Sequence, residues 1–583
     1  MALEDKGVRE IKTEVLIIGS EAAGAKAAIE AQDAGADVLV VTKGLVGKSG
    51  NTMMAGRGIQ APLGHMDPRD TPDAFLEDVV KGGAYLNNQK LVERLVSLSV
   101  TEVPKMEGWG ARFMKRDGKF LQYQMPGSSY PRSLASVGYH GGLQWRHAFR
   151  SQFQLRGTKI MQDTMITRLL LSSGQVAGAF GISLRNGQYF VIRSKQTILA
   201  TGGCSQIYRQ TDGSLDATGD GMVLAYRAGA ELMDMEFQQF FPMCCYTPPF
   251  EMSMLTANLR YGLHARFYNA VGEPFMERYL PVDKEWGLRD ITARAIYLEN
   301  KHGRGSPHGG AYIAVNHLPE NLINDWIKRE RPGYLSKLEQ VGIDIHKHAL
   351  ECGPACHYSM GGVRVNEDCE TTLRRLYAAG EVASGMDGAE RIDGGPAITW
   401  CLTMGYIAGK KAANGAKELN WLDIDLEQVK REQETINLLR ERKQGAKGYE
   451  IKYRIKDMMW ENCALVRNRN GLEEGIRCIQ KIRSDDLPAL CIPDSTRTLN
   501  KGLVEALEAR NMVELSEMIL RSALMREESR KSHYRADFPN SDDRKWLRNI
   551  VIKEKAGGMT LTTVPAIMAR IKPSEREETQ GLR

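Results

Sequence analysis

The amino-acid sequence predicts an α/β protein whose nucleotide-binding domain is split by an insertion and followed by a helical domain. The first observation is a strand–glycine turn–helix–strand unit within residues 14–41. The second is a pair of buried strands that end in glycines, at residues 197–203 and 376–382, far along the chain from that unit. The third is a change to charged helical segments from about residue 419. The 583 residues are enough for three or more domains.

The N-terminal unit has the pattern of a Rossmann-like nucleotide site. An apolar strand at residues 14–18 runs into the turn at residues 19–24, and an alanine-rich helix leads to a second strand at residues 37–41. Such a turn places a pyrophosphate at a helix N-terminus. Glu21 occupies the middle glycine position of GxGxxG, and Thr42-Lys43 replaces the expected acidic ribose-binding residue, which argues against a simple NAD site.

The later elements complete this pattern. Residues 197–203 and 376–382 are predicted as further buried strands of the same domain. Residues 425–444 and 502–529 carry apolar residues near helical spacing, which indicates helices that pack together rather than a chemical site. The tail after Lys555 has no clear periodicity.

Composition argues against several classes of protein. The net charge of +6, from 78 basic and 72 acidic residues, is too balanced to indicate nucleic-acid binding. No apolar run approaches the ~18 residues needed to span a bilayer, and the first fifteen residues contain no apolar signal core. We therefore expect a cytoplasmic protein that could still lie at the inner face of a membrane through partner subunits.

The ten cysteines do not predict a metal site. No CxxC pair is present, Cys244 and Cys245 are adjacent, and Cys352 and Cys356 are four residues apart. Both zinc and ferredoxin-like spacings are missing, so we expect reduced thiols in or near the core. Any iron–sulfur clusters that exchange electrons with this chain must then sit on another polypeptide.

Short motifs follow one another in a definite order through nearly the whole chain. Each is weak alone, but five or more in the right order are a strong signal. Together they resemble the flavoprotein subunit of succinate dehydrogenase and fumarate reductase, in a superfamily with L-aspartate oxidase and the adenylylsulfate reductase flavoprotein. The motifs are Thr201-Gly202-Gly203, Thr218-Gly219-Asp220-Gly221, residues 273–279, Arg289-Asp290, residues 357–362, Ala379-Gly380-Glu381 and residues 529–543.

This resemblance implies FAD, a substrate held beneath a capping domain, and a partner that is an iron–sulfur protein subunit. The fold class becomes a Rossmann-like FAD-binding domain (1–248 and 351–418) split by an α+β capping domain (249–350), then a C-terminal helical domain (419–555) and a tail (556–583). The residues that we expect to contact FAD are Gly19, Ser20, Glu21, Ala23, Gly24, Thr42, Lys43, Gly44, Ser49, Gly50, Asn51, Thr52, Gly56, Gly58, Thr164, Ala200, Thr201, Gly202, Gly203, Asp220, Gly380, Glu381, Arg391, Gly395, Ala397 and Ile398.

The resemblance also implies three catalytic residues. Arg289 would be the proton donor, and His357 and Arg391 match the family's carboxylate-binding pair. Reduction of an activated C=C bond needs hydride from flavin N5 at one carbon and a proton at the other, while fixed cations neutralise the developing charge. A guanidinium is an unusual acid, so the site must be dry and its protons replenished. The alternatives are an ion pair of Arg289 with Asp290 or Glu285 and a core position for His357.

The substrate pocket departs from the family pattern. Phe241 and Met243 stand where a QFHPT-like segment supplies histidine and threonine, and Thr256-Ala257 stands in place of a threonine–glutamate pair. Desolvating a carboxylate against such groups costs on the order of several kcal/mol. We therefore expect a substrate other than fumarate or succinate. It would carry one carboxylate or a thioester carbonyl at the Arg391/His357 end and an apolar or aromatic group at the other.

The glutamate of the family's proton relay is also missing, because its position falls near Gly262. Protons must then reach Arg289 by another route. Arg260, His264 and Glu285 are the nearby candidates, and the sequence leaves all three open.

Two further departures concern the flavin. Many family members attach FAD covalently through a histidine, and Asn51 aligns best with it here. Asparagine cannot form that bond, so we expect non-covalent FAD with a lower flavin potential, which disfavours oxidation of succinate-like alkanes. Residues 391–398 contain one extra residue relative to the family's RLGGNSL segment, and we expect their backbone N–H groups to lie at a helix start near the flavin.

Two other functions remain as alternatives. In adenylylsulfate reductase-like chemistry flavin N5 bonds sulfur, and those relatives also lack the histidine of the HPT segment; the motifs around Arg289 and His357 favour the C=C branch. L-Aspartate oxidase fits poorly because its substrate is a dicarboxylate. A flavin electron-transfer subunit without its own substrate would explain the lost polar groups, but not why Arg289, His357 and Arg391 are all present.

Overall fold

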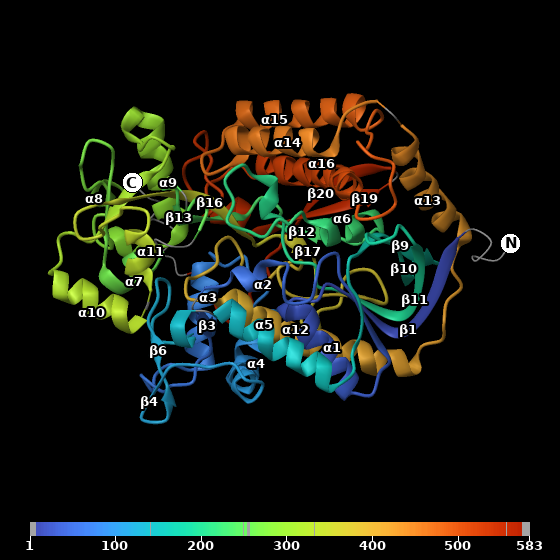
Figure 1. The fold of residues 1–583 in the computed structure, drawn as a ribbon, viewed down its shortest axis with the longest axis horizontal. Coiled ribbons are helices and arrows are strands. Elements are labelled where there is room, and N and C mark those ends of the chain that lie inside the picture. The colour runs from blue at the N-terminus through green and yellow to red at the C-terminus, as the bar shows by residue number, and fades with distance from the viewer. Residues whose placement is uncertain are drawn as a thin grey trace.

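The computed structural model describes residues 7–56, 58–139, 141–248, 250–253, 257–330, 333–442, 444–555 and 557–573. Figure 1 shows the inserted domain, in yellow-green, at one end of the nucleotide-binding domain, and the C-terminal helices, in orange, along one side of it. This arrangement matches the predicted α/β class with a split sheet domain and a helical domain.

The central sheet joins strands from three distant parts of the chain. Its strands are β1 (Val8–Ile18), β2 (Val38–Val41), β8 (Lys159–Met161), β9 (Thr164–Ser172), β10 (Gln175–Ser183), β11 (Tyr189–Leu199) and β18 (Leu376–Ala378). Among the described residues the order is β8-β2-β1-β11-β10-β9, and β18 also pairs with β11. The pairings β8–β2, β2–β1, β1–β11 and β11–β18 are parallel, whereas β10 and β9 are antiparallel additions. All four predicted strands are therefore present.

An alanine-rich helix and a helix with three glycines pack closely in this domain. Helix α1 (Ala22–Asp33) packs against α12 (Pro396–Glu418), which follows β18 after an intervening loop. A Cβ at Gly405 would lie 2.6 Å from the Ala23 carbonyl oxygen, and one at Gly409 would lie 2.4 Å from that of Ala27, so glycine is required for this close packing. The other elements of the domain are α2 (Asn51–Met54), β3 (Gly58–Gln60), α3 (Pro72–Gly82), α4 (Gln89–Gly108), β4 (Lys115–Arg116), β5 (Lys119–Phe120), β6 (Gln122–Tyr123), β7 (Ser133–Ala135), α5 (Gly141–Leu155) and α6 (Asp220–Arg227).

The inserted domain is an antiparallel sheet with helices around its own apolar core. Strand β13 (Gln238–Cys245) pairs with β16 (Leu350–Ser359); β13 ends before the boundary expected at residue 248, whereas β16 spans the one expected between residues 350 and 351. These two strands carry Phe241 and His357 from the inserted sheet into the site. The remaining elements are α7 (Ala257–Leu263), β14 (Arg266–Tyr268), α8 (Met276–Tyr279), α9 (Arg289–Glu299), β15 (Ala311–Ala314), α10 (Glu320–Glu330) and α11 (Tyr334–Glu339).

The C-terminal region contains more than the predicted helices. Helices α14 (Gly448–Cys463), α15 (Arg469–Lys481) and α16 (Lys501–Met525) pack together, and α13 (Leu426–Glu441) contacts β9. The segment after residue 555, expected to be an irregular tail, begins with β20 (Gly558–Pro565), which pairs with β19 (Arg548–Lys555) and through it joins β12 (Leu232–Met233) and β17 (Gly362–Val363). Periodicity missed β20 because it is an edge strand that alternates exposed and half-buried residues. No helix among the described residues is long and apolar enough to cross a membrane.

Candidate active site

One long cavity runs from the glycine turn after β1 to the inserted domain. Its empty volume is about 2050 Å³, including the part open to solvent. Every residue that was expected to contact the cofactor lines it, except Gly24 and Gly380. Those two permit close packing instead, because a Cβ at Gly24 would lie 2.0 Å from the Gly19 carbonyl oxygen and one at Gly380 would lie 2.8 Å from the Ala23 Cβ.

The turn after β1 has the geometry of an anion site. Gly19 has a φ of +111°, and a Cβ there would lie 2.1 Å from the Ala200 carbonyl oxygen, so only glycine lets the turn approach β11 this closely. The N-terminus of α1 faces the cavity through Glu21, Ala22 and Ala23. A helix N-terminus next to a glycine turn offers backbone N–H groups to the diphosphate of a dinucleotide, and this part of the cavity fits FAD.

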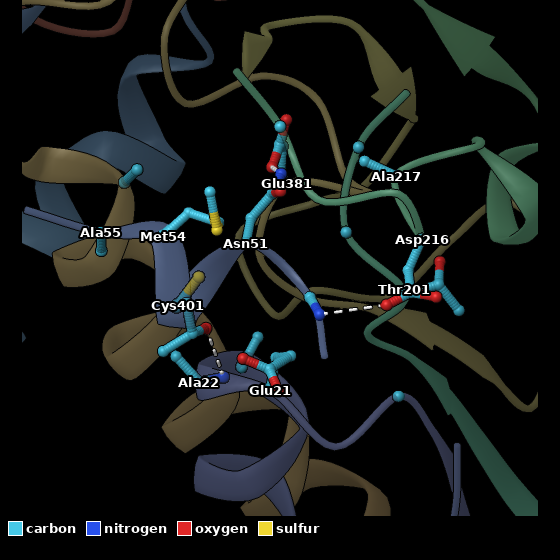
Figure 2. Close-up of a pocket in the computed structure, with 18 of the residues that line it drawn as sticks. Glu21, Ala22, Asn51, Met54, Ala55, Thr201, Asp216, Ala217, Glu381 and Cys401 are labelled. Carbon is cyan, nitrogen blue, oxygen red and sulfur yellow. Dashed lines mark hydrogen bonds between the residues drawn. The ribbon is translucent and has the colours of Figure 1, made fainter. Parts of the chain in front are cut away.

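Glu21 places a carboxyl group beside this anion site (Figure 2). It precedes the first residue of α1, and the loop glycine Gly50 lies against it, since a Cβ at Gly50 would be 2.5 Å from Glu21 Cγ. Burial raises the pKa of Glu21 to about 7, with the Thr52 hydroxyl opposing this rise and Asp216 adding to it. The carboxyl group of Glu21 therefore titrates near neutral pH.

We expect FAD binding to weaken as pH rises through about 7, and Glu21→Gln to reduce this dependence to the contribution of Glu381 in the same cavity. Below its pKa the carboxyl is neutral; above it the carboxylate repels the diphosphate, whereas glutamine stays neutral throughout. The measurement is the Kd of the apoprotein for FAD across this pH range, by quenching of flavin fluorescence. The exposed Glu77→Gln should keep the wild-type dependence. Equal pH dependence in wild type and Glu21→Gln would contradict this role.

Lys43 lies at the end of β2, where an acidic ribose-binding residue was expected. Its ammonium group is 2.8 Å from Asp220 and 2.8 Å from Glu508. Burial by itself would lower the pKa of Lys43, but these two carboxylates outweigh it and raise the pKa above its ordinary value. Because Glu508 belongs to α16, this ion-pair cluster joins the wall of the cavity to the helical domain.

Asn51 and Glu381 form a fixed pair in the cavity wall (Figure 2). The Asn51 amide nitrogen donates to Glu381 Oε2 at 3.2 Å, and the Asn51 Oδ1 accepts from the Ser214 N–H at 2.8 Å. Burial raises the pKa of Glu381 to about 7. The residue aligned with the family's flavin-attachment histidine is thus an amide held by both of its polar atoms.

We expect acid precipitation of the holoprotein to release its flavin. Asn51 offers no nucleophilic ring nitrogen, so FAD would be held by non-covalent contacts alone. The measurement is the yellow colour of the supernatant, with absorbance near the flavin maxima, after precipitation and centrifugation. A colourless supernatant over a yellow pellet would show covalent attachment and contradict the prediction.

The three predicted catalytic residues meet in one part of the cavity. Arg289 begins α9, His357 lies on β16, and Arg391 lies in the loop before α12. A fourth residue joins them: the side-chain oxygen of Gln239 accepts from Arg289 Nη1 at 3.0 Å and from Arg391 Nη2 at 2.7 Å. We call Arg289, His357, Arg391 and Gln239 the clamp. The acceptor that the two guanidinium groups share is thus an amide oxygen and not a carboxylate.

His357 is a neutral member of the clamp. Its Nδ1 lies 2.8 Å from Asp212 Oδ2, and its ring centroid lies 5.3 Å from that of Phe241. Burial lowers the pKa of His357; the Asp212 carboxylate opposes this, and the charges of Arg289 and Arg391 add to it. The imidazole therefore acts as a hydrogen-bonding group fixed by Asp212, and a core role away from the site is excluded.

Arg391 is buried against an aromatic face. Its guanidinium carbon lies 3.9 Å from the centroid of the Tyr358 ring. Burial, followed by repulsion from Arg289, lowers the pKa of Arg391 below its ordinary value. Its Nε has no hydrogen-bond partner within the described parts of the chain, and an incoming anion would supply one.

Arg289 is ion-paired, but with neither residue that the sequence suggested. Its Nε contacts the carboxylate of Asp393 instead of Asp290 or Glu285, and Asp393 is fully buried. Burial by itself would lower the pKa of Arg289. The pKa is nevertheless raised above its ordinary value, chiefly by Asp393 and then by Tyr261 and Glu390. Asp393 was not anticipated because it lies within the segment that carries one extra residue relative to the family pattern.

The three candidates for proton delivery do not contact Arg289 in the hydrogen bonds and ion pairs of the described residues. The Arg260 guanidinium donates to the backbone carbonyls of Glu285 and Gly287. His264 is exposed and stacks on Trp286, with ring centroids 5.6 Å apart. Arg260 and His264 therefore hold the loop of residues 285–287 that precedes α9.

The predicted substrate-pocket residues separate into different environments. Phe241 lines the cavity, with its ring beside His357 and 5.0 Å from the Arg289 guanidinium carbon. Met243 is fully buried in the apolar core of the inserted domain and does not line the cavity. Thr256 lies outside the described residues, and Ala257 begins α7. Of the four, Phe241 is the residue that the structure places beside the clamp.

Comparison with known proteins agrees with this arrangement. Residues 14–396 match the family model described as an FAD binding domain, and residues 452–578 match the one described as fumarate reductase flavoprotein C-term. The chain is 37% identical, over 93% of its length and 97% of the relative's, to a chain of the fumarate reductase (CoM/CoB) of Methanothermobacter marburgensis. The first matched segment supplies most of the cavity lining, and the second contains most of α14 and all of α15 and α16.

Solved structures show the same fold. The FrdA chain of E. coli quinol fumarate reductase matches with a TM-score of 0.90 and 25% identity, over 98% of this chain and 99% of that one. Adenylylsulfate reductase from Archaeoglobus fulgidus matches with a TM-score of 0.79 and 21% identity, over 97% and 98% of the two chains, which shows the fold alone. The resemblance drawn from the motifs and the FAD cofactor are both confirmed. The chain therefore belongs to the family of succinate dehydrogenase and fumarate reductase flavoprotein subunits, as an FAD-dependent oxidoreductase acting on CH–CH groups.

Proposed function

We propose that this chain is the catalytic subunit of an enzyme that acts on a C=C or CH–CH unit next to a single carboxyl or thioester group, with neither fumarate nor succinate as its substrate. The charge balance of the clamp carries this proposal. Arg289 is paired with Asp393, and the lowered pKa of His357 keeps its imidazole neutral. Arg391 is the clamp cation without an ion pair in the described part of the chain. One unpaired cation suits one carboxylate.

The residues of the clamp have separate roles in this reaction. Bound FAD supplies hydride chemistry at its N5. Arg391 and His357 hold the substrate carboxyl group, and Gln239 fixes the two guanidinium groups at their spacing. Arg289 delivers a proton to the carbon that does not receive hydride, in a position largely shielded from water.

The apolar side of the site supports a one-carboxylate substrate. Phe241 is 1% exposed, and its ring lies beside both Arg289 and His357 without offering a hydrogen bond. A second carboxylate placed against it would lose water without replacement, at a cost on the order of several kcal/mol. An ester, thioester, alkyl or aryl group would lose little hydration free energy in the same position.

An iron–sulfur subunit is the partner that we propose. All ten cysteines are free thiols, and the described residues contain no cluster of three or more side chains that could hold a metal ion. The relatives are named as parts of larger enzymes, which supports a partner that carries electrons to or from the flavin. Any membrane association would come through such partners.

Fumarate is the second candidate substrate, because the methanogen relative is named a fumarate reductase. Ligand binding to the oxidised holoprotein separates the two. Monomethyl succinate and succinate differ by the replacement of one carboxylate with a neutral ester, and each should perturb the flavin absorbance on binding. We expect monomethyl succinate to bind at least about tenfold more tightly, equivalent to about 1.4 kcal/mol. Tighter binding of succinate would overturn the one-carboxylate proposal.

A further inference from the structure

We propose that Asp393 and Tyr261 form the path that reprotonates Arg289 after each turnover. This inference rests on the proposed role of Arg289 as proton donor. Both residues lie where the sequence departs from the family pattern: Tyr261 precedes the position of the missing relay glutamate, and Asp393 lies in the segment with one extra residue. The structure brings these two departures into contact.

The first contact joins Asp393 to Arg289. Asp393 is fully buried, and one of its carboxylate oxygens, Oδ1, pairs with Arg289 Nε. Its backbone carbonyl accepts from Gln60 Nε2 at 2.7 Å, and the next two residues, Gly394 and Gly395, have φ values of +99° and +98°. This glycine-dependent turn fixes the aspartate backbone while the carboxylate reaches Arg289.

The second contact joins Asp393 to Tyr261. The Tyr261 hydroxyl donates to Asp393 Oδ2 at 2.8 Å, on the carboxylate oxygen that Arg289 does not use. Tyr261 lines the cavity and is half-buried, so a side chain that bonds the fully buried Asp393 also reaches the cavity. Arg260 Nη1 lies 3.3 Å from the same hydroxyl. A carboxylate between a guanidinium and a hydroxyl is an arrangement through which a proton can pass.

The proton balance of the path is simple. Arg289 loses one proton to the substrate carbon and becomes a neutral guanidine. Asp393, protonated from Tyr261, returns one proton to Arg289 and becomes a carboxylate again, and Tyr261 regains its proton from water. Each turnover thus consumes one proton from solvent, and no electrons move along this path.

Stopped-flow kinetics of Tyr261→Phe test the path, because this change removes one oxygen and keeps the Asp393–Arg289 ion pair. The probe is monomethyl fumarate or fumarate, whichever the wild type reduces faster, mixed with reduced holoprotein. We expect the first turnover to keep nearly the wild-type rate, since Arg289 begins charged, and steady-state turnover to fall about 100-fold. Asp393→Asn should slow both phases, and Asp393→Glu should restore part of the steady-state rate.

The outcomes separate this proposal from a purely structural role. Equal slowing of the first and later turnovers in Tyr261→Phe would show positioning alone, and no slowing of either would remove Tyr261 from the path; both overturn the proposal. His264→Ala, which alters the stacking on Trp286, should match the wild type in both phases. An unchanged first turnover in Arg289→Gln, whose amide cannot act as the acid, would instead contradict the proton-donor role, whatever Tyr261→Phe shows.

Discussion

Replacing Arg289 with alanine is expected to lower kcat by at least about 1,000-fold, within the range that a positioned proton donor contributes, while FAD stays bound. The guanidinium lies in the clamp, where it pairs with Asp393 and shares the Gln239 side-chain oxygen with Arg391. The measurement is steady-state reduction of the preferred unsaturated acid with reduced viologen as electron donor. Flavin content comes from the absorbance of the same preparation.

The matched control for this change is Arg294→Ala, on the same helix. Arg294 packs its guanidinium over the Tyr534 ring at 4.5 Å, away from the cavity lining, so the variant should keep near wild-type turnover. Full activity of Arg289→Ala with FAD retained would contradict a catalytic clamp. That result would favour the alternative of a flavin electron-transfer subunit without its own substrate.

Phe241→His is expected to shift specificity toward the dicarboxylate. An imidazole between His357 and Arg289 can hydrogen-bond a second carboxylate, and a hydrogen bond to a charged group contributes about 1.5–3 kcal/mol. The ratio of kcat/KM for fumarate to that for monomethyl fumarate should therefore rise by roughly 10- to 100-fold. Phe241 is fully buried beside both residues, so the new imidazole ring would lie next to His357 and Arg289.

Phe241→Leu provides the control for altered packing. Leucine keeps the position apolar and offers no hydrogen bond, so the specificity ratio should stay near that of the wild type even if both rates fall. A ratio that changes equally in Phe241→Leu and Phe241→His would show that ring volume, and not polarity, decides the substrate. An unchanged ratio in Phe241→His with FAD retained would show that Phe241 does not face the second substituent.

Local patterns in the sequence were enough to predict the cofactor site. Gly19 and the strand before it belong to a strand–turn unit that a few consecutive residues are enough to identify. The structure shows why glycine is needed at this turn. The gathering of Arg289, His357 and Arg391 required the ordered motifs of a whole family, because these residues come from α9, β16 and the loop before α12. Periodicity alone gives no distance between such elements.

The contacts around the clamp could not be predicted from local sequence patterns. The alternation of a strand predicts that Phe241 and Met243 share a face, yet the register between β13 and β16 shifts after Phe241, and Met243 is buried in the core of the inserted domain. Gln239 is the first residue of the QFHPT-like segment and carries no charge that would indicate its role, although its amide oxygen accepts hydrogen bonds from both arginines. The contact of Tyr261 with Asp393 spans 132 positions in the chain and depends on how the inserted domain sits on the α12 loop.

The most direct measurement of a one-carboxylate site is kcat/KM of the wild type for monomethyl fumarate against fumarate, at one pH and with one electron donor. The two compounds share the activated C=C bond and one carboxylate, and they differ where Phe241 would meet the second substituent. Burial of an unpaired carboxylate at about 3 kcal/mol predicts a preference for monomethyl fumarate of at least about 100-fold. A preference for fumarate, with a KM in the micromolar range, would contradict the proposed substrate class.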